Sequence, residues 1–380
     1  MGFFEPFALE RFFAKHEFSA KFLLCSSDCE SLPIRDLLAM EEGSTERLLD
    51  LRLGYTETRG APSLRDALAG QYRDLSPDAF FVHSGAEEAI LNLCLATLDR
   101  GDRVIVNVPC YQSLAEIPRA LGCEVVPWKL RETTSRTGSP RWFLDPSELD
   151  ALCGNGARMI VLNAPHNPTG ALPTRDEFDA IVAYARSSGA ILLVDEVYRR
   201  LERNEADRLP SVCEAYENGV ALDVLSKHAG LAGLRIGWLA SRRIDILDAV
   251  AVVKDYNLIC SSAPSEALAE IAVRNLDAIT ARTRGIVARN LSLLDAFFKR
   301  RPDFAAWTPP AGGSIAFPRL TDGSDAEALA ERIVAESGVQ TPADVAALRK
   351  SGADAVLVGE ALMRAETRQD MLRQFREAAR

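Results

Sequence analysis

The stretches MIVLNAPHNPTG at residues 159–170 and ILLVDEVY at residues 191–198 decide the fold of this chain of 380 residues. Each starts as an apolar run of strand length and ends in polar residues that packing does not explain. Similar apolar runs lie at residues 80–83, 103–108, 124–128 and 221–225. Helical patterns separate most of them, for example at residues 87–98, 111–121 and 175–187. This alternation predicts an α/β fold with a mostly parallel sheet that helices cover on both faces.

Composition excludes several classes of protein. No apolar run is long enough to cross a membrane. With 54 acidic against 44 basic side chains and no basic block, the chain is a poor partner for nucleic acid or an anionic membrane. The eight cysteines are spread along the chain like free buried thiols, and Cys25 and Cys29 lack a second pair with zinc spacing. Since the N-terminus has no signal-peptide pattern, we expect a cytoplasmic protein without a metal site.

Residues able to hold a cofactor follow the ends of successive predicted strands. The run 80–83 leads into Gly85 and a helix whose first backbone N–H groups suit a phosphate. The other strand ends lead to an amide, an acid, a phenol, a lysine and an arginine, namely Asn167, Asp195, Tyr198, Lys227 and Arg235. Because the carboxyl ends of parallel strands share one edge of a sheet, we expect these side chains to meet there.

Together these side chains complement pyridoxal phosphate. A carboxylate keeps a pyridine nitrogen protonated, an amide and a phenol fix a ring hydroxyl, a lysine forms a Schiff base, and an arginine holds a phosphate. Singly, each residue also has a structural explanation as a paired acid, a core aromatic or a surface ion pair. Those explanations do not account for all five at one edge. The nearby His83, His166 and His228 lack metal-ligand spacing, so we interpret them as packing or orienting residues.

Three motifs resemble those of the class I/II (fold-type I) pyridoxal-phosphate-dependent aminotransferases. They are NPTG at residues 167–170, DEVY at 195–198 and SK…GLRIGW at 226–238, and they follow the order of that family. The resemblance covers about residues 45–335 and implies catalytic roles for three residues. Lys227 would form the Schiff base and carry protons, Asp195 would pair with the pyridine nitrogen, and Tyr198 would hold the ring oxygen together with Asn167.

The same resemblance implies the rest of the cofactor site and an assembly. The phosphate would be held by Gly85, Ala86, Glu87 and Arg235. Tyr111 would stack on the ring, and Tyr55 would reach the phosphate of a neighbouring subunit, which implies a homodimer. The implied domains are a large cofactor-binding domain at 36–265 and a small C-terminal domain at 266–380, which the N-terminal arm at 1–35 joins.

The chain departs from the family in two places. Val224 stands where the family often has a serine that contacts the phosphate. Residues 334–365 instead resemble the C-terminal end of indole-3-glycerol phosphate synthase, a (β/α)₈ barrel, so the stretch 334–380 is atypical. Leu357 then falls near the expected carboxylate-binding arginine, and Arg364 is the nearest substitute. Barrel catalysis is disfavoured because a quarter of a barrel cannot close a sheet.

We therefore expect an aminotransferase that acts on an amino acid and a 2-oxo acid through Lys227. The same cofactor site would also serve elimination, replacement or cyclisation of an amino acid, or a cofactor-binding protein with impaired turnover. The acidic stretch 24–30 could line the substrate pocket and suit a basic amino acid. Residues 265–300 predict one long helix, broken only at Gly285, with Arg282, Arg284 and Arg289 on a solvated face.

Overall fold

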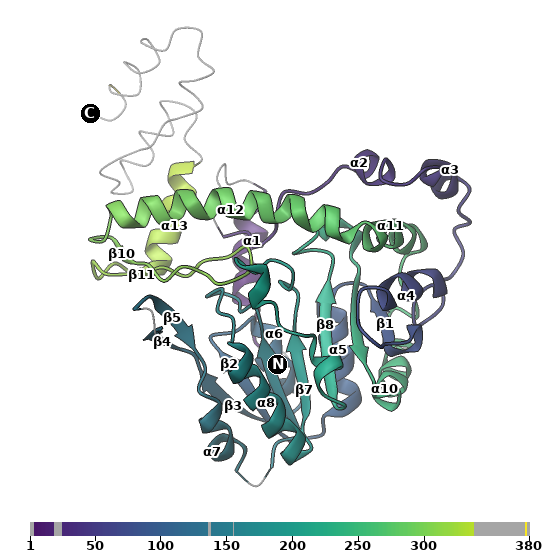
Figure 1. Ribbon diagram of the computed structural model, residues 1–380, viewed down its shortest axis with the longest axis horizontal. Helices are drawn as coiled ribbons and strands as arrows, with labels where there is room; N and C mark the ends of the chain where they lie inside the picture. The colour runs from purple at the N-terminus through teal and green to yellow at the C-terminus, as the bar shows by residue number, and fades with distance from the viewer. Residues whose placement is uncertain (1–3, 19–24, 136–137, 155, 338–376, 378–380) are drawn as a thin grey trace. The chain divides into compact units, whose positions relative to one another are not determined.

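The computed structural model describes residues 4–18, 25–135, 138–154, 156–337 and 377 (Figure 1). Its contacts divide the chain into two units. Unit 1 comprises Met1–Glu5, Ser27–Arg300 and Trp307–Pro318, and unit 2 comprises Pro6–Ser26, Arg301–Ala306 and Arg319–Arg380. The boundaries drawn from the family resemblance, near residues 36 and 265, stay predictions. Most of the atypical stretch 334–380 lies outside the described residues.

Unit 1 is built on a seven-stranded sheet with the order β1-β9-β8-β7-β6-β2-β3. Its strands are β1 (Phe80–His83), β2 (Arg103–Val108), β3 (Glu124–Lys129), β6 (Met159–Asn163), β7 (Ile191–Asp195), β8 (Gly219–Val224) and β9 (Gly237–Ser241). β9 runs opposite to the other six strands of this sheet, which are parallel to one another, and this confirms the mostly parallel α/β fold. β9 itself was not predicted, because its residues were assigned to a motif that follows Lys227.

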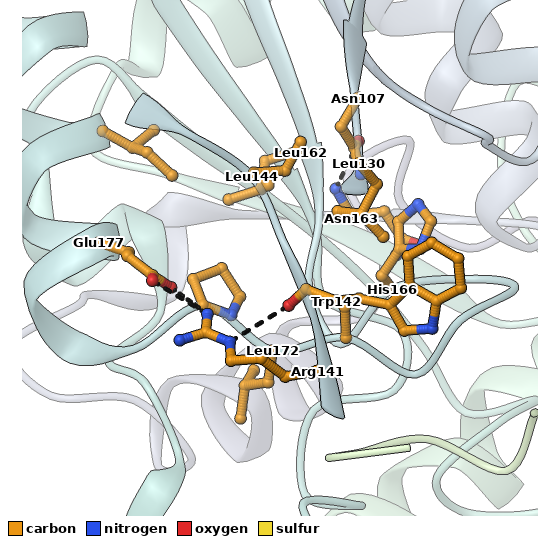
Figure 2. Close-up of a pocket in the computed structure, with 13 residues that line it drawn as sticks. Asn107, Leu130, Arg141, Trp142, Leu144, Leu162, Asn163, His166, Leu172 and Glu177 are labelled. Atoms are coloured by element: carbon orange, nitrogen blue, oxygen red, sulfur yellow. Dashed lines mark hydrogen bonds and ion pairs between the residues drawn. The ribbon is translucent and has the colours of Figure 1, made fainter. Parts of the chain in front are cut away.

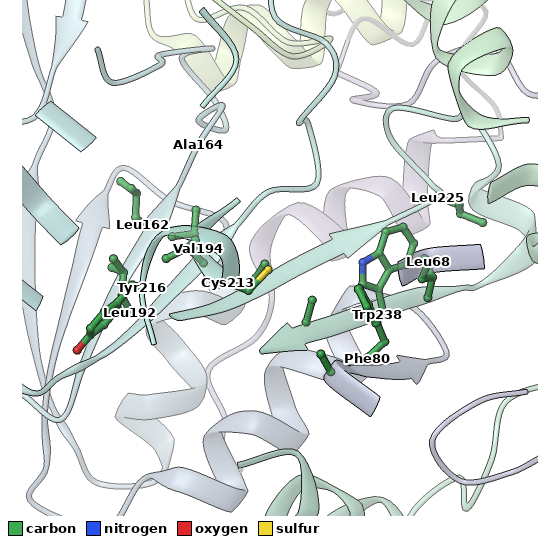
Figure 3. Close-up of a cluster of buried hydrophobic side chains, with 14 of the residues drawn as sticks. Leu68, Phe80, Leu162, Ala164, Leu192, Val194, Cys213, Tyr216, Leu225 and Trp238 are labelled. Atoms are coloured by element: carbon green, nitrogen blue, oxygen red, sulfur yellow. The ribbon is translucent and has the colours of Figure 1, made fainter. Parts of the chain in front are cut away.

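Helices cover both faces of this sheet because neighbouring strand residues point to opposite sides. On one face, Leu162 and Leu192 pack with α4 (Pro62–Ala69), α8 (Arg175–Ser188) and α11 (Ala263–Arg274). Figure 3 shows part of this cluster, including Leu192, Tyr216 and Trp238. On the other face, Val161 and Leu193 pack with α5 (Ala86–Thr97), α6 (Gln112–Ala120) and α10 (Ile244–Lys254). Each fully buried aliphatic side chain contributes about 1.5–3 kcal/mol, so the strand ends stand on a rigid base.

The helical region after residue 262 differs from its prediction. It is not one helix broken at Gly285: α11 ends at Arg274, and α12 (Leu276–Arg300) runs through Gly285 without interruption. The break is at Asn275, whose side chain donates a hydrogen bond to the Ile271 carbonyl at 2.9 Å. Asparagine side chains compete with helical backbone bonds in this way, whereas a single glycine inside a long helix costs only about 1 kcal/mol.

The remaining elements are short. In unit 1 they are α2 (Ile34–Leu38), α3 (Ser44–Leu49), α7 (Leu149–Cys153), α9 (Val212–Ala215) and the hairpin of β4 (Arg131–Thr134) with β5 (Pro140–Phe143). In unit 2 they are α1 (Ala8–His16), the two-residue pair β10 (Ala305–Ala306) and β11 (Arg319–Leu320), and α13 (Ala326–Ser337). α1 lies within the N-terminal arm at 1–35. None of the described helices is long and apolar enough to cross a membrane.

Candidate active site

The carboxyl ends of β6, β7 and β8 bring the predicted polar residues to one edge of the sheet. Asn163, the last residue of β6, pairs in register with Asp195, the last residue of β7. The Asn163 side chain donates a hydrogen bond to the Asp195 carbonyl at 2.9 Å and accepts one from the Asn167 backbone at 2.5 Å. Asn163 thus links Asp195 to the loop that carries Asn167, a role that the sequence did not single out.

Asp195 is an acid in a buried setting. Within the described part of the chain its side chain accepts one hydrogen bond, from the Val197 backbone at 3.2 Å, and the residue is only 5% exposed. The pKa of this carboxyl is raised from 3.8 to about 7, mainly by burial and in smaller part by the charges of Asp223 and Glu87, while the Val197 hydrogen bond and Lys227 oppose the rise. A carboxyl with so few partners is poised to pair with a cation that enters the site.

Tyr198 brings an unpartnered hydroxyl to the same place. The residue is 1% exposed, and its hydroxyl has no hydrogen-bond partner among the described residues. Burial raises its pKa, and Ser27 lies close enough to oppose that shift without hydrogen-bond geometry. Because a buried hydroxyl is normally hydrogen-bonded, Tyr198 indicates that a polar ligand atom belongs beside it.

The start of α5 and Arg235 form a cradle. Gly85 caps the helix with φ +99°, and a Cβ built there would lie 2.7 Å from Arg235 Nη2. Gly237 also permits a close approach, since its Cβ would come within 3.2 Å of the Ala86 backbone nitrogen. The Arg235 side chain is exposed, and among the described residues its one acceptor is the Ala232 carbonyl, at 3.3 Å. The first backbone N–H groups of a helix, when they lie beside a guanidinium, form an anion site.

Glu87 and Tyr111 flank this cradle. The Glu87 carboxylate accepts a hydrogen bond from Ser113 Oγ at 3.1 Å, so its side chain is turned to α6 and only its backbone can serve an anion. Tyr111 is the N-cap residue of α6 and packs partly buried against the core below it. Both therefore lie at the site edge.

Tyr55 is not brought to this cluster within one chain. It is 89% exposed, and no hydrogen bond between described residues links it to the other site residues. Its neighbour Thr56 is fixed by hydrogen bonds to the Ser261 carbonyl and to Glu266, at 3.0 and 3.1 Å. The loop is thus held in place with Tyr55 projecting outward.

Lys227 follows β8 and points to residues far away in sequence. Its Nζ donates to Ser27 Oγ at 2.8 Å and to Asp28 Oδ1 at 2.7 Å. The next residue, His228, is fully buried and contacts Asp223 Oδ1 through Nε2 at 3.1 Å. This buried pair anchors the turn that presents Lys227, and only the tertiary structure identifies Asp28 as its ion-pair partner.

A small cavity lies beside this edge, between β2, β6 and the β4–β5 hairpin (Figure 2). Its volume is about 10 Å³, which is room for about one water molecule and not for a substrate. His166 lines it and holds the Asn167 loop, contacting Thr169 Oγ1 at 2.8 Å and the Pro109 carbonyl at 2.7 Å. Burial lowers the His166 pKa to about 4, so the ring is neutral at pH 7 and orients the loop.

The site residues fit pyridoxal phosphate. The orphaned Tyr198 hydroxyl suits a ring oxygen, and the cradle that a Cβ at Gly85 would fill suits a phosphate. Asp195 and Lys227 supply the acid and the amine at the same edge. No group of three His, Cys, Asp or Glu side chains in the described part of the chain could hold a metal ion.

Comparison with known proteins agrees with this geometry. Residues 20–347 match the family described as Aminotransferase class I and II. Capreomycidine synthase from Streptomyces vinaceus is 29% identical over 87% of this chain and 84% of its own, and valine–pyruvate aminotransferase from Mycobacterium tuberculosis is 30% identical over 76% and 74%. A pyridoxal-phosphate-dependent aminotransferase structure from Streptococcus suis, 28% identical, superposes with a TM-score of 0.81 over 99% of this chain and 97% of that one.

The chain therefore belongs to the class I and II aminotransferase family. It has the fold-type I architecture and is a pyridoxal-phosphate-dependent aminotransferase that acts on an amino acid. The family match does not support the resemblance of residues 334–365 to indole-3-glycerol phosphate synthase, and residues 338–376 lie outside the described residues. Leu357 and Arg364 fall in that part of the chain.

Proposed function

We propose that Lys227 holds pyridoxal phosphate covalently and that the strand-end residues position it. Asp195 would pair with the ring nitrogen, Asn167 and Tyr198 with the ring oxygen, and Tyr111 with the ring face. The phosphate would be bound by Arg235 and by the backbone of Gly85, Ala86 and Glu87. The observation that carries the proposal is the meeting of a buried acid, an orphaned phenol and an amine beside a helix-start cradle.

In this arrangement each residue has a defined task. Bound pyridoxal phosphate supplies an electron sink that makes the α-hydrogen of an amino acid acidic. Asp195, ionised by the cation it meets, would keep a proton on the ring nitrogen. Lys227 Nζ, once released by the substrate, would accept the α-proton and return it at another carbon. The rigid sheet beneath both residues keeps them in position without reorganisation.

The proposal includes a homodimer in which Tyr55 completes the partner's phosphate site. Large apolar side chains are exposed on two neighbouring segments, namely Leu49 at the end of α3, Leu53, Tyr55, Tyr256, Leu258 and Ile259. The hydrogen bond from Thr56 to the Ser261 carbonyl joins the two segments. A cluster of large exposed apolar side chains marks a surface where proteins associate. Light scattering should therefore give the mass of a dimer, and Leu53→Asp should give monomers that bind the cofactor weakly.

A second candidate reaction uses the same residues. Capreomycidine synthase, similar over 87% of the chain, is a synthase by name, which favours elimination, replacement or cyclisation as the alternative to transfer. Transfer of the amino group needs a 2-oxo acid as acceptor. If the atypical segment derives from a barrel synthase, Arg364 would be the residue that binds the substrate carboxylate. Without such a partner the protein would bind the cofactor and turn over poorly. We place the protein in the cytoplasm, where its eight free thiols stay reduced.

The test is covalent labelling of the purified protein. Cofactor-loaded protein should be yellow, and borohydride should fix one pyridoxyl group on the peptide that contains Lys227. Lys227→Ala should abolish both the colour and transfer from every amino donor, whereas Lys129→Ala, at an exposed lysine on β3, should change neither. A label on any other lysine, or unchanged turnover in Lys227→Ala, would contradict the assignment.

A further inference from the structure

A buried carboxylate, Glu266 in α11, holds the loop that carries Tyr55. Its Oε1 accepts a hydrogen bond from Thr56 Oγ1 at 3.1 Å, and its Oε2 accepts one from the Ala61 backbone at 2.7 Å. Glu266 is only 2% exposed, and α11 packs beside α4, which begins directly after Ala61 (Figure 1). Both carboxylate oxygens are thus used to fix the chain that follows Tyr55.

The charge of Glu266 is balanced by a second buried residue, Lys254 in α10. Lys254 is fully buried, and its Nζ donates to the Val82 carbonyl at 2.7 Å and to Ser261 Oγ at 3.5 Å. Burial raises the pKa of Glu266, while its hydrogen bonds to the loop and the charge of Lys254 oppose that rise. A buried pair of charges adds little net stability over an apolar pair, so its presence is better explained by the conformation that it fixes.

The rest of the loop is held by Arg65 in α4. Its Nε donates to the Gly60 carbonyl at 3.1 Å, and its Nη2 donates to Glu57 Oε2 at 3.2 Å. Residues 56–61 are therefore fixed by side chains from α4 and α11, whereas Tyr55 itself is 89% exposed. A loop that is ordered before it meets a partner avoids the entropy cost of becoming ordered on association.

We propose that Glu266 is a positioning residue for the phosphate site of the partner subunit. By fixing Thr56, it would hold Tyr55 in the orientation that reaches this phosphate. The proposal rests on the homodimer proposed above and adds the residue on which its shared site depends. A change at Glu266 should therefore be felt in the cofactor site of the other subunit, not in the site of its own subunit.

The experiment uses mixed dimers that contain a single covalent cofactor site. One subunit carries Lys227→Ala, the other keeps Lys227, and a different affinity tag on each allows the mixed dimer to be purified. The remaining yellow site belongs to the Lys227 subunit, while the Tyr55 that completes it comes from the Lys227→Ala subunit. Titration with pyridoxal phosphate, followed by the yellow absorbance, then measures one site whose two contributors can be changed separately.

Glu266→Gln in the Lys227→Ala subunit should weaken cofactor binding about tenfold, because Tyr55 loses its fixed orientation toward the phosphate. The same substitution in the Lys227 subunit should change the affinity by no more than about twofold. Thr56→Val should give the same asymmetry. It removes the hydroxyl that contacts Glu266 and leaves the buried charges in place, so it tests the proposal even if Glu266→Gln fails to fold.

Glu270→Gln is the matched control. Glu270 lies one turn further along α11, but its carboxylate accepts a hydrogen bond from Ser63 Oγ in α4 at 2.6 Å and does not contact the Tyr55 loop. Its substitution should leave cofactor binding unchanged in either subunit. A loss of binding when Glu266→Gln or Thr56→Val is placed in the Lys227 subunit would overturn the proposal, because it would assign the effect to that subunit's own site.

Tyr55→Phe in the Lys227→Ala subunit separates this proposal from the one on which it rests. If Tyr55→Phe weakens cofactor binding there and neither Glu266→Gln nor Thr56→Val does, Glu266 is not a positioning residue, and the shared site stands. If Tyr55→Phe has no effect there, or if the protein is monomeric, the shared site is wrong and the role of Glu266 falls with it. In each case borohydride would still label Lys227, so the assignment of the Schiff-base lysine is tested separately.

Discussion

Lys227 is influenced by two regions that are held in different ways: it contacts Ser27 and Asp28 in the segment Ser27–Glu30, and it interacts electrostatically with Asp195 in the strand-end cluster. Asn163 and Asp195 are last residues of adjacent parallel strands, and the register of the sheet fixes their spacing. Ser27 and Asp28 lie in a loop whose backbone carbonyls accept hydrogen bonds from the side chains of Ser314 and Arg282, across 287 and 252 residues of sequence. The difference separates strand ends that the register of the sheet fixes from a loop that depends on a few side-chain contacts, which single substitutions can remove.

The largest expected effect is at the strand ends, at Asp195. Asp195→Asn should lower kcat by at least about 100-fold, since it removes the charge that pairs with the ring nitrogen. In the cofactor-free protein the same change should raise the free energy of unfolding. The raised pKa means that the folded state holds a proton which the unfolded state releases, so stability falls as pH rises from about 4 to about 7.

The stability of Asp195→Asn should therefore exceed that of the wild type above pH 7, by up to about 4 kcal/mol. Urea unfolding at pH 5 and pH 8 measures this difference. Some pH dependence should persist in the variant because burial also raises the pKa of Glu196 to about 7. If the variant were less stable than the wild type at pH 8, burial of the ionised Asp195 carboxylate would not be destabilising, and the prediction would be wrong.

A smaller effect is expected at the cradle. Gly85→Ala should weaken cofactor binding by at least about tenfold, because the new Cβ meets the Arg235 guanidinium. Equilibrium dialysis against pyridoxal phosphate measures it. Gly101→Ala is the matched control: its φ is +91°, but nothing lies within 4 Å of its Cβ. Both changes should cost about 1–2 kcal/mol of stability through backbone strain, and only Gly85→Ala should affect the cofactor.

The smallest effect is expected at the loop Ser27–Glu30. Arg282 was predicted to lie on a solvated face, but it instead anchors this loop. Arg282→Ala should leave the cofactor spectrum unchanged and raise KM for the preferred amino acid several-fold, since the Glu30 carbonyl loses its donor. The stability cost should be about 1 kcal/mol. Arg289→Ala, on the same helix and without this contact, serves as the control. If Arg282→Ala lost the cofactor instead, the two regions would not be separable.

The strands and the polar residues at their ends could be predicted from the sequence because their signals are local. A strand that ends in Asp195 or Asn163 can be recognised from a short window, and parallel strands bring such ends together. β9 escaped prediction since its residues read as a continuation of the lysine motif. The helix break was placed at Gly285 because glycine is the usual breaker, whereas the actual break depends on the Asn275 side chain.

By itself, the sequence determined the α/β fold and the motifs that identify the family, because hydrophobic periodicity and short motifs are properties of neighbouring residues. Only the tertiary structure decided which groups share the site with those motifs. It left the Tyr198 hydroxyl without a hydrogen-bond partner among the described residues, turned the Glu87 carboxylate to Ser113 and brought Asp28 to Lys227. The Asp28 contact spans 199 residues of sequence. Tertiary packing brings such distant residues together, and it leaves no periodic pattern in the sequence from which the contact could be predicted.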